Sequence, residues 1–209
     1  MVKDVWPYLT VGLVVTAILA LTAPLGAAVA AGLVTLGVAS FFRDPWRDVP
    51  SDRRLILSPA DGRVVRISPE GAAAGEMRVS IFLSVFNVHV NRAPVAGRIS
   101  GIQYSPGSFL PAFRHKASEL NEQNLITLQT ERGPLAVKQI AGLIARRIRC
   151  WKRTGDAVAQ GEKIGFITFG SRVDLFLPAR TELKVAEGDR VRGGTTVIAV
   201  YTGEPGASS

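Results

Sequence analysis

The chain has 209 residues, of which 47% are hydrophobic, a single cysteine, and a formal net charge of +8. This composition excludes a disordered chain and one held by intrachain disulfides, and it allows one domain of ordinary size with an appendage. The positive charge predicts an anionic partner. Because the sequence has no recognition-helix pattern, zinc-finger spacing or RNP-type aromatic strand, we expect lipid head groups rather than nucleic acid.

The first segment of the chain is apolar. No charged residue occurs from Val5 to Phe42, whereas a helix crosses a bilayer with about 20 apolar residues and a signal peptide has an apolar core of only about 7–15. A proline and a glycine interrupt the run near its middle, which favours two helices, roughly 8–21 and 25–42. We therefore expect residues 1–43 to form a membrane-anchoring helical hairpin, with a re-entrant or shallow insertion as the alternative to full crossing.

Cationic residues follow this apolar segment; one directly follows it, and the others lie within a stretch, 44–57, that we interpret as a linker. Positive charge beside a membrane segment favours the cytoplasmic side, and the lone cysteine agrees with a reducing compartment. We therefore expect a protein of the cell membrane whose remaining residues lie on the cytoplasmic side. The cations that carry this argument are Arg43, Arg47, Arg53 and Arg54.

From residue 58 to residue 209 the chain reads as mostly β. Short runs with the alternation of half-buried strands are separated by glycine and proline, and only two stretches show weak helical spacing. We expect this part to form a single β-rich domain.

Two quasi-repeats refine that expectation. Residues 155–164 match 188–197 as G-D-x-V-x-x-G-x-x-[IV], and residues 59–64 match 94–99 as P-x-x-G-R-[VI]. Glycine and aspartate at these positions are turn chemistry, so each unit is predicted to be a turn that leads into a strand. These elements resemble the interlocked hairpins of barrel-sandwich folds of the biotinyl/lipoyl type.

The two copies of the second quasi-repeat differ in one carboxylate. Asp61 precedes Gly62 in the first copy, whereas Ala96 precedes Gly97 in the second. The turn therefore does not require an acid there. Asp before Gly is nevertheless favourable in turns, so a turn role and a functional role for Asp61 both stay open.

Few side chains are left that could carry chemistry. His89 lies at the end of a strand-like run, and His115 has charged neighbours typical of a solvated loop. One cysteine and two separated histidines give no metal-ligand spacing, so we expect no metal, and no glycine-rich phosphate loop is present. This leaves Ser171, with His89 and Asp61 as its candidate partners.

A serine, a histidine and a carboxylate can together make a hydroxyl nucleophilic. A hydrolase would favour the pattern G-x-S-x-G, and the sequence around Ser171 lacks its second glycine. The preceding residue, Gly170, suggests a different target, the carbonyl of Gly170 itself. Glycine has no Cβ to crowd the attack and tolerates a strained backbone.

Six short motifs occur in order along the chain: FFRDP at 41–45, SPADG at 58–62, FNVHVNRAP at 86–94, NEQN at 121–124, IAGLIARR at 140–147 and FGSR at 169–172. Together with the uncharged N-terminal segment, they closely resemble the short form of phosphatidylserine decarboxylase. The resemblance implies a proenzyme cut between Gly170 and Ser171 into a β chain (1–170) and an α chain (171–209). The two chains would stay together without a disulfide because the cut falls inside an interleaved β fold.

The resemblance also implies the chemistry of maturation. An ester formed by Ser171 undergoes β-elimination, and the dehydroalanine that remains hydrolyses to a covalent pyruvoyl group with loss of ammonia. Asp61 would orient His89, and His89 would be the base that activates Ser171.

The implied reaction is the pyruvoyl-dependent decarboxylation of phosphatidylserine to phosphatidylethanolamine, with release of carbon dioxide. The pyruvoyl group acts as an electron sink, and His89 is the candidate proton donor. The implied partners are membrane phosphatidylserine and the protein's own two chains as a heterodimer, with a higher homo-oligomer allowed. Phe86, Arg92, His115 and the segment 105–116 are the candidates for substrate binding.

One departure from the family pattern concerns Arg92. Longer members carry H-x-x-H-x-P, whereas this chain has arginine at the second histidine position. Either His89 serves both maturation and turnover, or Arg92 or a water replaces the missing histidine.

The alternative interpretation is a membrane-anchored barrel-sandwich adaptor or carrier domain without enzymatic activity. A carrier needs a modifiable lysine at a hairpin tip, whereas Lys163 and Lys184 lie where strands begin. An efflux adaptor needs a long coiled coil, and residues 63–154 contain no sustained heptads. Both alternatives leave the pair Gly170 and Ser171 unexplained.

Overall fold

The computed structural model describes residues 1–2, 5–70, 76–107, 121–142, 147–168 and 170–203. It divides into two compact units, one of residues 1–46 and one of residues 47–209. Each unit is described by itself.

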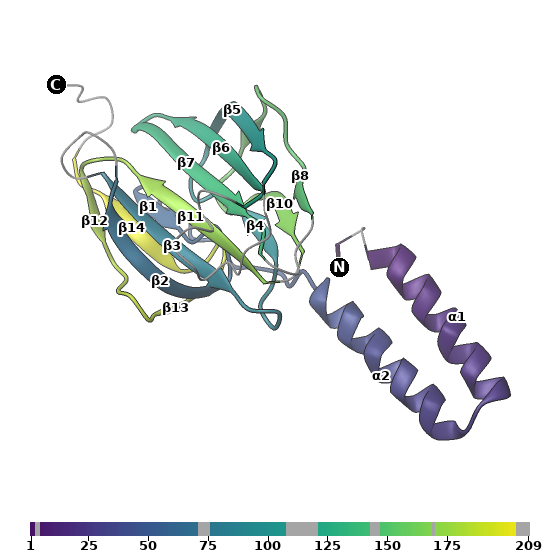
Figure 1. The fold of residues 1–209 in the computed structure, drawn as a ribbon. Coiled ribbons are helices and arrows are strands. Elements are labelled where there is room, and N and C mark those ends of the chain that lie inside the picture. The colour runs from purple at the N-terminus through teal and green to yellow at the C-terminus, as the bar shows by residue number, and fades with distance from the viewer. Residues whose placement is uncertain (3–4, 71–75, 108–120, 143–146, 169, 204–209) are drawn as a thin grey trace. The chain divides into compact units, whose positions relative to one another are not determined.

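The first unit is a helical hairpin. Helix α1 spans Trp6–Thr22 and helix α2 spans Leu25–Phe41, which confirms the expected pair of helices to within two residues at each end (Figure 1). The break falls at Pro24, because proline cannot continue the hydrogen-bonding pattern of α1. At the open end of the hairpin the Val2 amide donates to the Phe42 carbonyl at 3.0 Å.

The two helices contact each other closely. A Cβ on Gly12 would approach Thr35 Oγ1 to 2.6 Å, so a glycine is needed at that contact. Each threonine of the hairpin donates its hydroxyl to the carbonyl four residues earlier, which hides the polar group along the helix; these residues are Thr10, Thr16, Thr22 and Thr35. Within the described residues, neither helix has the combination of length and apolar character needed to pass through a membrane.

The second unit is mostly β, as expected. In chain order its strands are β1 (Leu55–Leu57), β2 (Gly62–Pro69), β3 (Met77–Leu83), β4 (Val90–Arg92), β5 (Gly97–Ser105), β6 (Gln123–Thr130), β7 (Gly133–Ile140), β8 (Ile148–Cys150), β9 (Ala157–Val158), β10 (Lys163–Ile167), β11 (Ser171–Leu177), β12 (Thr181–Leu183), β13 (Arg190–Val191) and β14 (Val197–Tyr201). The stretch that we expected to be a linker, 44–57, therefore ends in a strand, and the compact unit already begins at Arg47.

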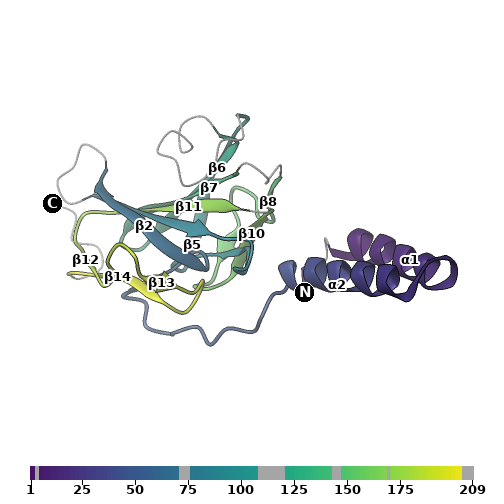
Figure 2. The same cartoon turned by 60° about the horizontal axis from the view of Figure 1, so that its bottom comes forward.

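These strands form one large sheet and two small ones. The eight-stranded sheet has the order β13-β2-β3-β11-β7-β6-β5-β9 and curls into a half-barrel (Figures 1 and 2). The three-stranded sheets have the orders β1-β14-β12 and β4-β10-β8. All pairs are antiparallel.

Apolar side chains from the large and small sheets form one core. Val173, Leu175 and Leu177 of β11 belong to it, and they alternate along the strand as one face of a sheet requires. The same alternation puts Ser171, the first residue of β11, on this inward face. The core therefore ends at a polar residue where β11 begins.

The quasi-repeats of the sequence are repeats of structure. The glycines that begin and end the G-D-x-V-x-x-G unit have positive φ in both copies, a conformation that glycine adopts without steric cost. These angles are +97° at Gly155, +75° at Gly161, +97° at Gly188 and +77° at Gly194.

The two copies also pair in the same way at the two edges of the large sheet. At one edge β13 pairs with β2 beginning at Gly62, and at the other β9 pairs with β5 beginning at Gly97. Equivalent backbone hydrogen bonds of 2.9 Å join them, from the Val64 amide to Asp189 and from the Ile99 amide to Asp156. The β unit thus contains two copies of one interlocked arrangement.

The last strands of the chain are shared between sheets. β11 lies in the middle of the large sheet, between β3 and β7, while β13 pairs with β2 and β14 pairs with β1. The segment that starts at Ser171 is therefore woven into the segment that precedes it.

Candidate active site

Ser171, the candidate nucleophile, is the first residue of β11, and Gly170, its candidate target, directly precedes that strand. Ser171 pairs with Leu83 of β3 and is fully buried. Its hydroxyl has no hydrogen-bond partner within the described part of the chain. Gly170 has φ +61°, and a Cβ there would meet nothing within 4 Å. The backbone conformation, rather than a lack of space, is what favours glycine at this position.

His89 lies beside β10, just before β4. Its carbonyl accepts the amide of Ile167 at 3.3 Å, and its ring is fully buried at 6.3 Å from the Phe166 ring. The ring Nδ1 lies 2.9 Å from the Asn87 carbonyl. Because a carbonyl can only accept, Nδ1 carries the hydrogen, and Nε2 is the nitrogen that can take a further proton.

Asp61 lies in the loop before β2, and its carboxylate has strong partners. Arg47 Nη2 donates to both carboxylate oxygens, at 2.8 and 3.0 Å, and the Gly193 amide donates to Oδ1 at 2.8 Å. Arg47 therefore pairs inside the β unit, although we expected it among the flanking cations. The orientation of His89 by Asp61 stays a prediction, since in this structure these partners engage the carboxylate.

A buried row of amide side chains starts on the face of the large sheet that carries the candidate nucleophile, and sequence reasoning missed it. Gln139 of β7 stands opposite Val173 of β11. Gln139 Nε2 donates to Asn91 Oδ1 at 2.8 Å, and Asn124 Nδ2 donates to Gln139 Oε1 at 2.9 Å. All three are buried, and in the described residues Asn91 Nδ2 has no partner. A polar residue at an inward position of an apolar strand was the available signal.

The other face of β11 carries a buried ion pair. Arg172 Nε and Nη2 donate to the Asp174 carboxylate at 2.6 and 3.1 Å, and Nη2 donates to Ser80 Oγ at 2.6 Å. Arg172 and Asp174 are both nearly inaccessible. This cation is neutralised, and strand alternation directs it away from Ser171.

Of the three residues proposed for substrate binding, one is buried, one is exposed, and one lies outside the described residues. Arg92 is buried, and its Nη1 donates to the Gly161 carbonyl at 3.0 Å. Phe86 lies in the turn after β3 and is 83% exposed, unlike the wall of a closed pocket. His115 lies outside the described residues, as does most of the segment 105–116.

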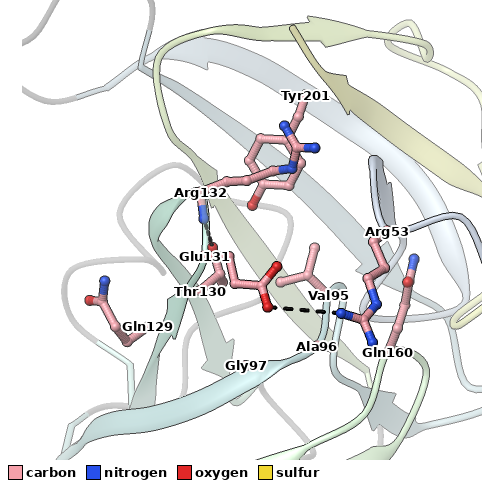
Figure 3. A pocket seen from close by; sticks show the side chains of 10 residues that line it. All are labelled: Arg53, Val95, Ala96, Gly97, Gln129, Thr130, Glu131, Arg132, Gln160 and Tyr201. Atoms are coloured by element: carbon pink, nitrogen blue, oxygen red, sulfur yellow. Dashed lines mark hydrogen bonds and ion pairs between the residues drawn. The ribbon is translucent and has the colours of Figure 1, made fainter. Parts of the chain in front are cut away.

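A hollow of about 330 Å³ is lined by residues that include Arg53, Glu131 and Tyr201 (Figure 3). Arg53 pairs with Glu131 across it at 3.8 Å, and the Arg132 guanidinium lies over the Tyr201 ring. Burial raises the pKa of the Tyr201 phenol above its usual value. The hollow borders the end of β6, whereas the start of β6 pairs with Ile140, the partner of Arg172. It is therefore at the opposite end of these strands from Ser171.

No three His, Cys, Asp or Glu side chains gather as a metal site in the residues that the structure describes. The candidate hydroxyl of Ser171, the imidazole of His89 and the amides of Asn91, Gln139 and Asn124 are all buried.

Comparison with known proteins assigns the chain to a family. A profile of the family described as phosphatidylserine decarboxylase matches residues 34–199. The chain is 44% identical over 201 residues to the phosphatidylserine decarboxylase proenzyme of Ralstonia nicotianae, covering 94% of each chain. The proenzymes of Ralstonia pickettii and Burkholderia cenocepacia are 44% and 41% identical over the same coverage. The chain belongs to the phosphatidylserine decarboxylase family. Asp61, His89 and Ser171 all lie within the part that matches the phosphatidylserine decarboxylase profile.

Proposed function

We propose that this chain is a proenzyme that cuts itself between Gly170 and Ser171 and then decarboxylates phosphatidylserine to phosphatidylethanolamine. The observation that carries the proposal is the buried Ser171 hydroxyl, without a described partner, directly after a glycine with positive φ. Membership of the phosphatidylserine decarboxylase family supports the substrate.

The cut needs only groups of this chain and one water. Ser171 Oγ attacks the Gly170 carbonyl, the C–N bond breaks, and the peptide becomes an ester with a free Ser171 amine. A base then removes the Ser171 Cα proton, and the Cβ–O bond breaks to leave Gly170 as a carboxylate. Water hydrolyses the resulting dehydroalanine to a ketone and releases ammonia, so residue 171 ends as a pyruvoyl group.

The surroundings of Ser171 fit such a group. Ser171 begins β11, which lies between β3 and β7, and its side chain is fully buried from solvent. When formed, the pyruvoyl group supplies a carbonyl that takes the substrate amine and acts as a sink for the electrons left by carbon dioxide.

His89 supplies the proton transfers in this proposal. Its Nε2 is the basic nitrogen, because Nδ1–H donates to the Asn87 carbonyl. It takes the Ser171 Oγ proton during maturation and returns a proton to the substrate Cα during turnover. Asp61, close to the α-chain residue Gly193, supports His89 as the carboxylate of the triad.

The interleaved strands support a heterodimer that persists after the cut. Residues 171–203 contribute β11 and β13 to the eight-stranded sheet, and they contribute β12 and β14 to the small sheet that also contains β1. The paired copies of the G-D-x-V-x-x-G turn also support a fold of the barrel-sandwich type, with the biotinyl/lipoyl-like hairpins as its two halves.

The helical hairpin supports a location at the cell membrane. Each helix has 17 residues, or about 25 Å at the usual rise, against a hydrocarbon core of about 30 Å. We infer an insertion that dips into the cytoplasmic leaflet instead of a full crossing, with the β unit in the cytoplasm. Exposed apolar side chains on both helices, among them Leu21 and Leu25, are the surface that lipid would cover.

The test is the intact mass of the purified protein under denaturing conditions. We expect two chains ending and beginning at Gly170 and Ser171, with the smaller lighter by one ammonia than a serine-started peptide. The Ser171→Ala variant stays as one chain, while Ser80→Ala, which removes another buried serine, is cut. An uncut wild-type protein that is folded would contradict the proposal.

A further inference from the structure

We propose that Asn91 binds the carboxylate of the substrate's serine head group through its Nδ2, and that Gln139 and Asn124 hold Asn91 in position. The inference rests on the proposed function, because it assigns a contact to the substrate of that same site. In this role Asn91 is a specificity-determining residue, because it distinguishes the substrate, which has the carboxylate, from the product, which lacks it.

The topology brings Asn91 to the nucleophile. The Ile167 amide bonds the His89 carbonyl in continuation of the β4–β10 pairing, so strand alternation puts His89 and Asn91 on one face. On β11, Ser171 and Val173 share a face, and Val173 stands opposite Gln139, which bonds Asn91. Ser171 thus lies on the sheet face that carries Gln139, and Asn91, which Gln139 bonds, lies on the β4 face that carries His89; all four side chains are buried.

The row of amides fixes which atom of Asn91 is available. Gln139 Nε2 occupies Asn91 Oδ1, and Gln139 Oε1 is itself held by Asn124 Nδ2. The Asn91 side chain is fully buried, and its Nδ2 has no partner in the part of the chain that the structure describes. Buried amide donors are almost always satisfied in folded proteins. A donor held in place and left without a partner is suited to an acceptor that arrives with a ligand.

The acceptor that fits is a carboxylate. Substrate and product of the proposed reaction differ only by that group, so recognition of the substrate head requires a donor for it. A neutral amide orients the carboxylate without the full charge of a guanidinium, which would stabilise the ionised ground state against loss of carbon dioxide. Arg172, the nearby cation, is paired with Asp174 on the other face of β11.

The experiment uses Asn91→Asp. This change keeps an oxygen for Gln139 Nε2 and replaces the free donor by a negatively charged acceptor. In the mature enzyme we expect KM for phosphatidylserine to rise about 10- to 100-fold, the effect of losing a hydrogen bond to a charged group. Asn91→Leu, which removes the donor without adding charge, is the second variant and should act in the same direction.

A binding measurement gives a readout that does not need turnover. Mature protein reduced with borohydride is titrated by calorimetry with glycerophosphoserine and with glycerophosphoethanolamine, which lacks the carboxylate. Both Asn91 variants should lose affinity for the first and keep it for the second. Gln160→Glu, the same amide-to-acid change at the opposite end of the strands, should alter neither affinity.

The outcomes separate this inference from the function on which it rests. An uncut wild-type chain contradicts the proposed function before any variant is made. Cut variants that bind glycerophosphoserine as the wild type does overturn the role of Asn91. Variants that fold but stay uncut also overturn it, because they place Asn91 in maturation instead of carboxylate recognition.

Discussion

At the scale of single residues, Asp61 is where the two copies of the repeated arrangement differ. Its counterpart Ala96 occupies the equivalent turn without a carboxylate, and both turns pair with the sheet edge in the same way. The Asp61 carboxylate instead receives Arg47 and the Gly193 amide. The turn therefore forms without an acid, and the acid needs another explanation.

A pair of substitutions separates the ion pair of Asp61 from its proposed role in the cut. Asp61→Ala should fold, yet lose about 1–3 kcal/mol because the nearly buried Arg47 is left without its partner. Arg47→Met added to Asp61→Ala should recover much of that stability by removing the unpaired charge. Urea unfolding measures the stabilities.

Intact mass measures maturation of the same proteins. Both Asp61→Ala proteins should stay uncut, while Arg47→Met alone is cut. Normal cutting of the stable double variant would show that the carboxylate is dispensable for the chemistry.

The residues of the site differ in how far the sequence could predict them. Ser171 follows a glycine in a context that turn chemistry does not explain, and the structure places it buried at the start of β11. The row of amides joins the neighbouring strands β6 and β7, through Asn124 and Gln139, to Asn91 of β4, which lies 48 residues before Gln139. No local pattern in the sequence connects Asn91 with the other two. The sequence alone shows that Gln139 is a polar amide at an inward position of a largely apolar strand. Only the strand pairing shows which residues it can bond.

At the scale of elements, the two G-D-x-V-x-x-G turns have the same backbone and different side-chain support. In the first turn Glu162 bonds Lys152 and accepts the Ala159 amide at 2.7 Å. The equivalent residue of the second turn is Thr195. Burial raises the pKa of Glu162, but the bonds to Lys152 and the Ala159 amide outweigh burial and hold that pKa below its ordinary value of 4.5.

This shift predicts how stability depends on pH. A carboxyl whose pKa is lowered by folding contributes stability above its unfolded pKa and loses it as pH falls through the folded value. Glu162→Gln should therefore be less stable than the wild type above about pH 4.5, and the difference should shrink as the pH falls further. Urea midpoints measured between acid and neutral pH test this.

Lys152→Met is the matched variant for the Glu162→Gln measurements, because it removes the same Lys152–Glu162 ion pair by changing the cation. Its loss of stability relative to the wild type should depend on pH in the same way as that of Glu162→Gln. A stability difference that stays constant across the whole range would mean that the Glu162 carboxylate does not carry the effect.

The elements themselves were largely predictable, and their partners were not. The helix bounds follow from a charge-free run broken by Pro24, and the strands follow from alternation and turn residues. The pairing of β11 with β3 joins segments some ninety residues apart (Ser171 with Leu83). Such a pairing is decided by which faces bury each other, and no local preference encodes it.

At the scale of the whole molecule, strands from both sides of the proposed cut support each other. β11 has a neighbour from residues before Gly170 on each side, and β14 pairs with β1. Breaking one peptide bond at the start of β11 removes none of these pairings. The cut should therefore change the covalent structure and leave the fold in place.

The prediction concerns separation of the chains of the mature protein. In increasing urea, the α chain should leave the β chain only over the same range in which the β-sheet circular dichroism is lost. Size exclusion at each urea concentration measures the separation, and uncut Ser171→Ala gives the reference unfolding curve. Release of the α chain at lower urea, with the sheet signal intact, would mean that the interleaved strands do not hold the chains together.

The position of Ser171 has a consequence for quality control. Ser171 begins β11, which lies between two strands that precede Gly170 in the chain, β3 and β7, and Gly170 itself has positive φ. In the proposed maturation, a misfolded copy would not bring these strands together and would therefore not form the ketone. Each molecule that completes the proposed cut would then carry, in its own cleaved backbone, a lasting chemical sign that it had folded correctly.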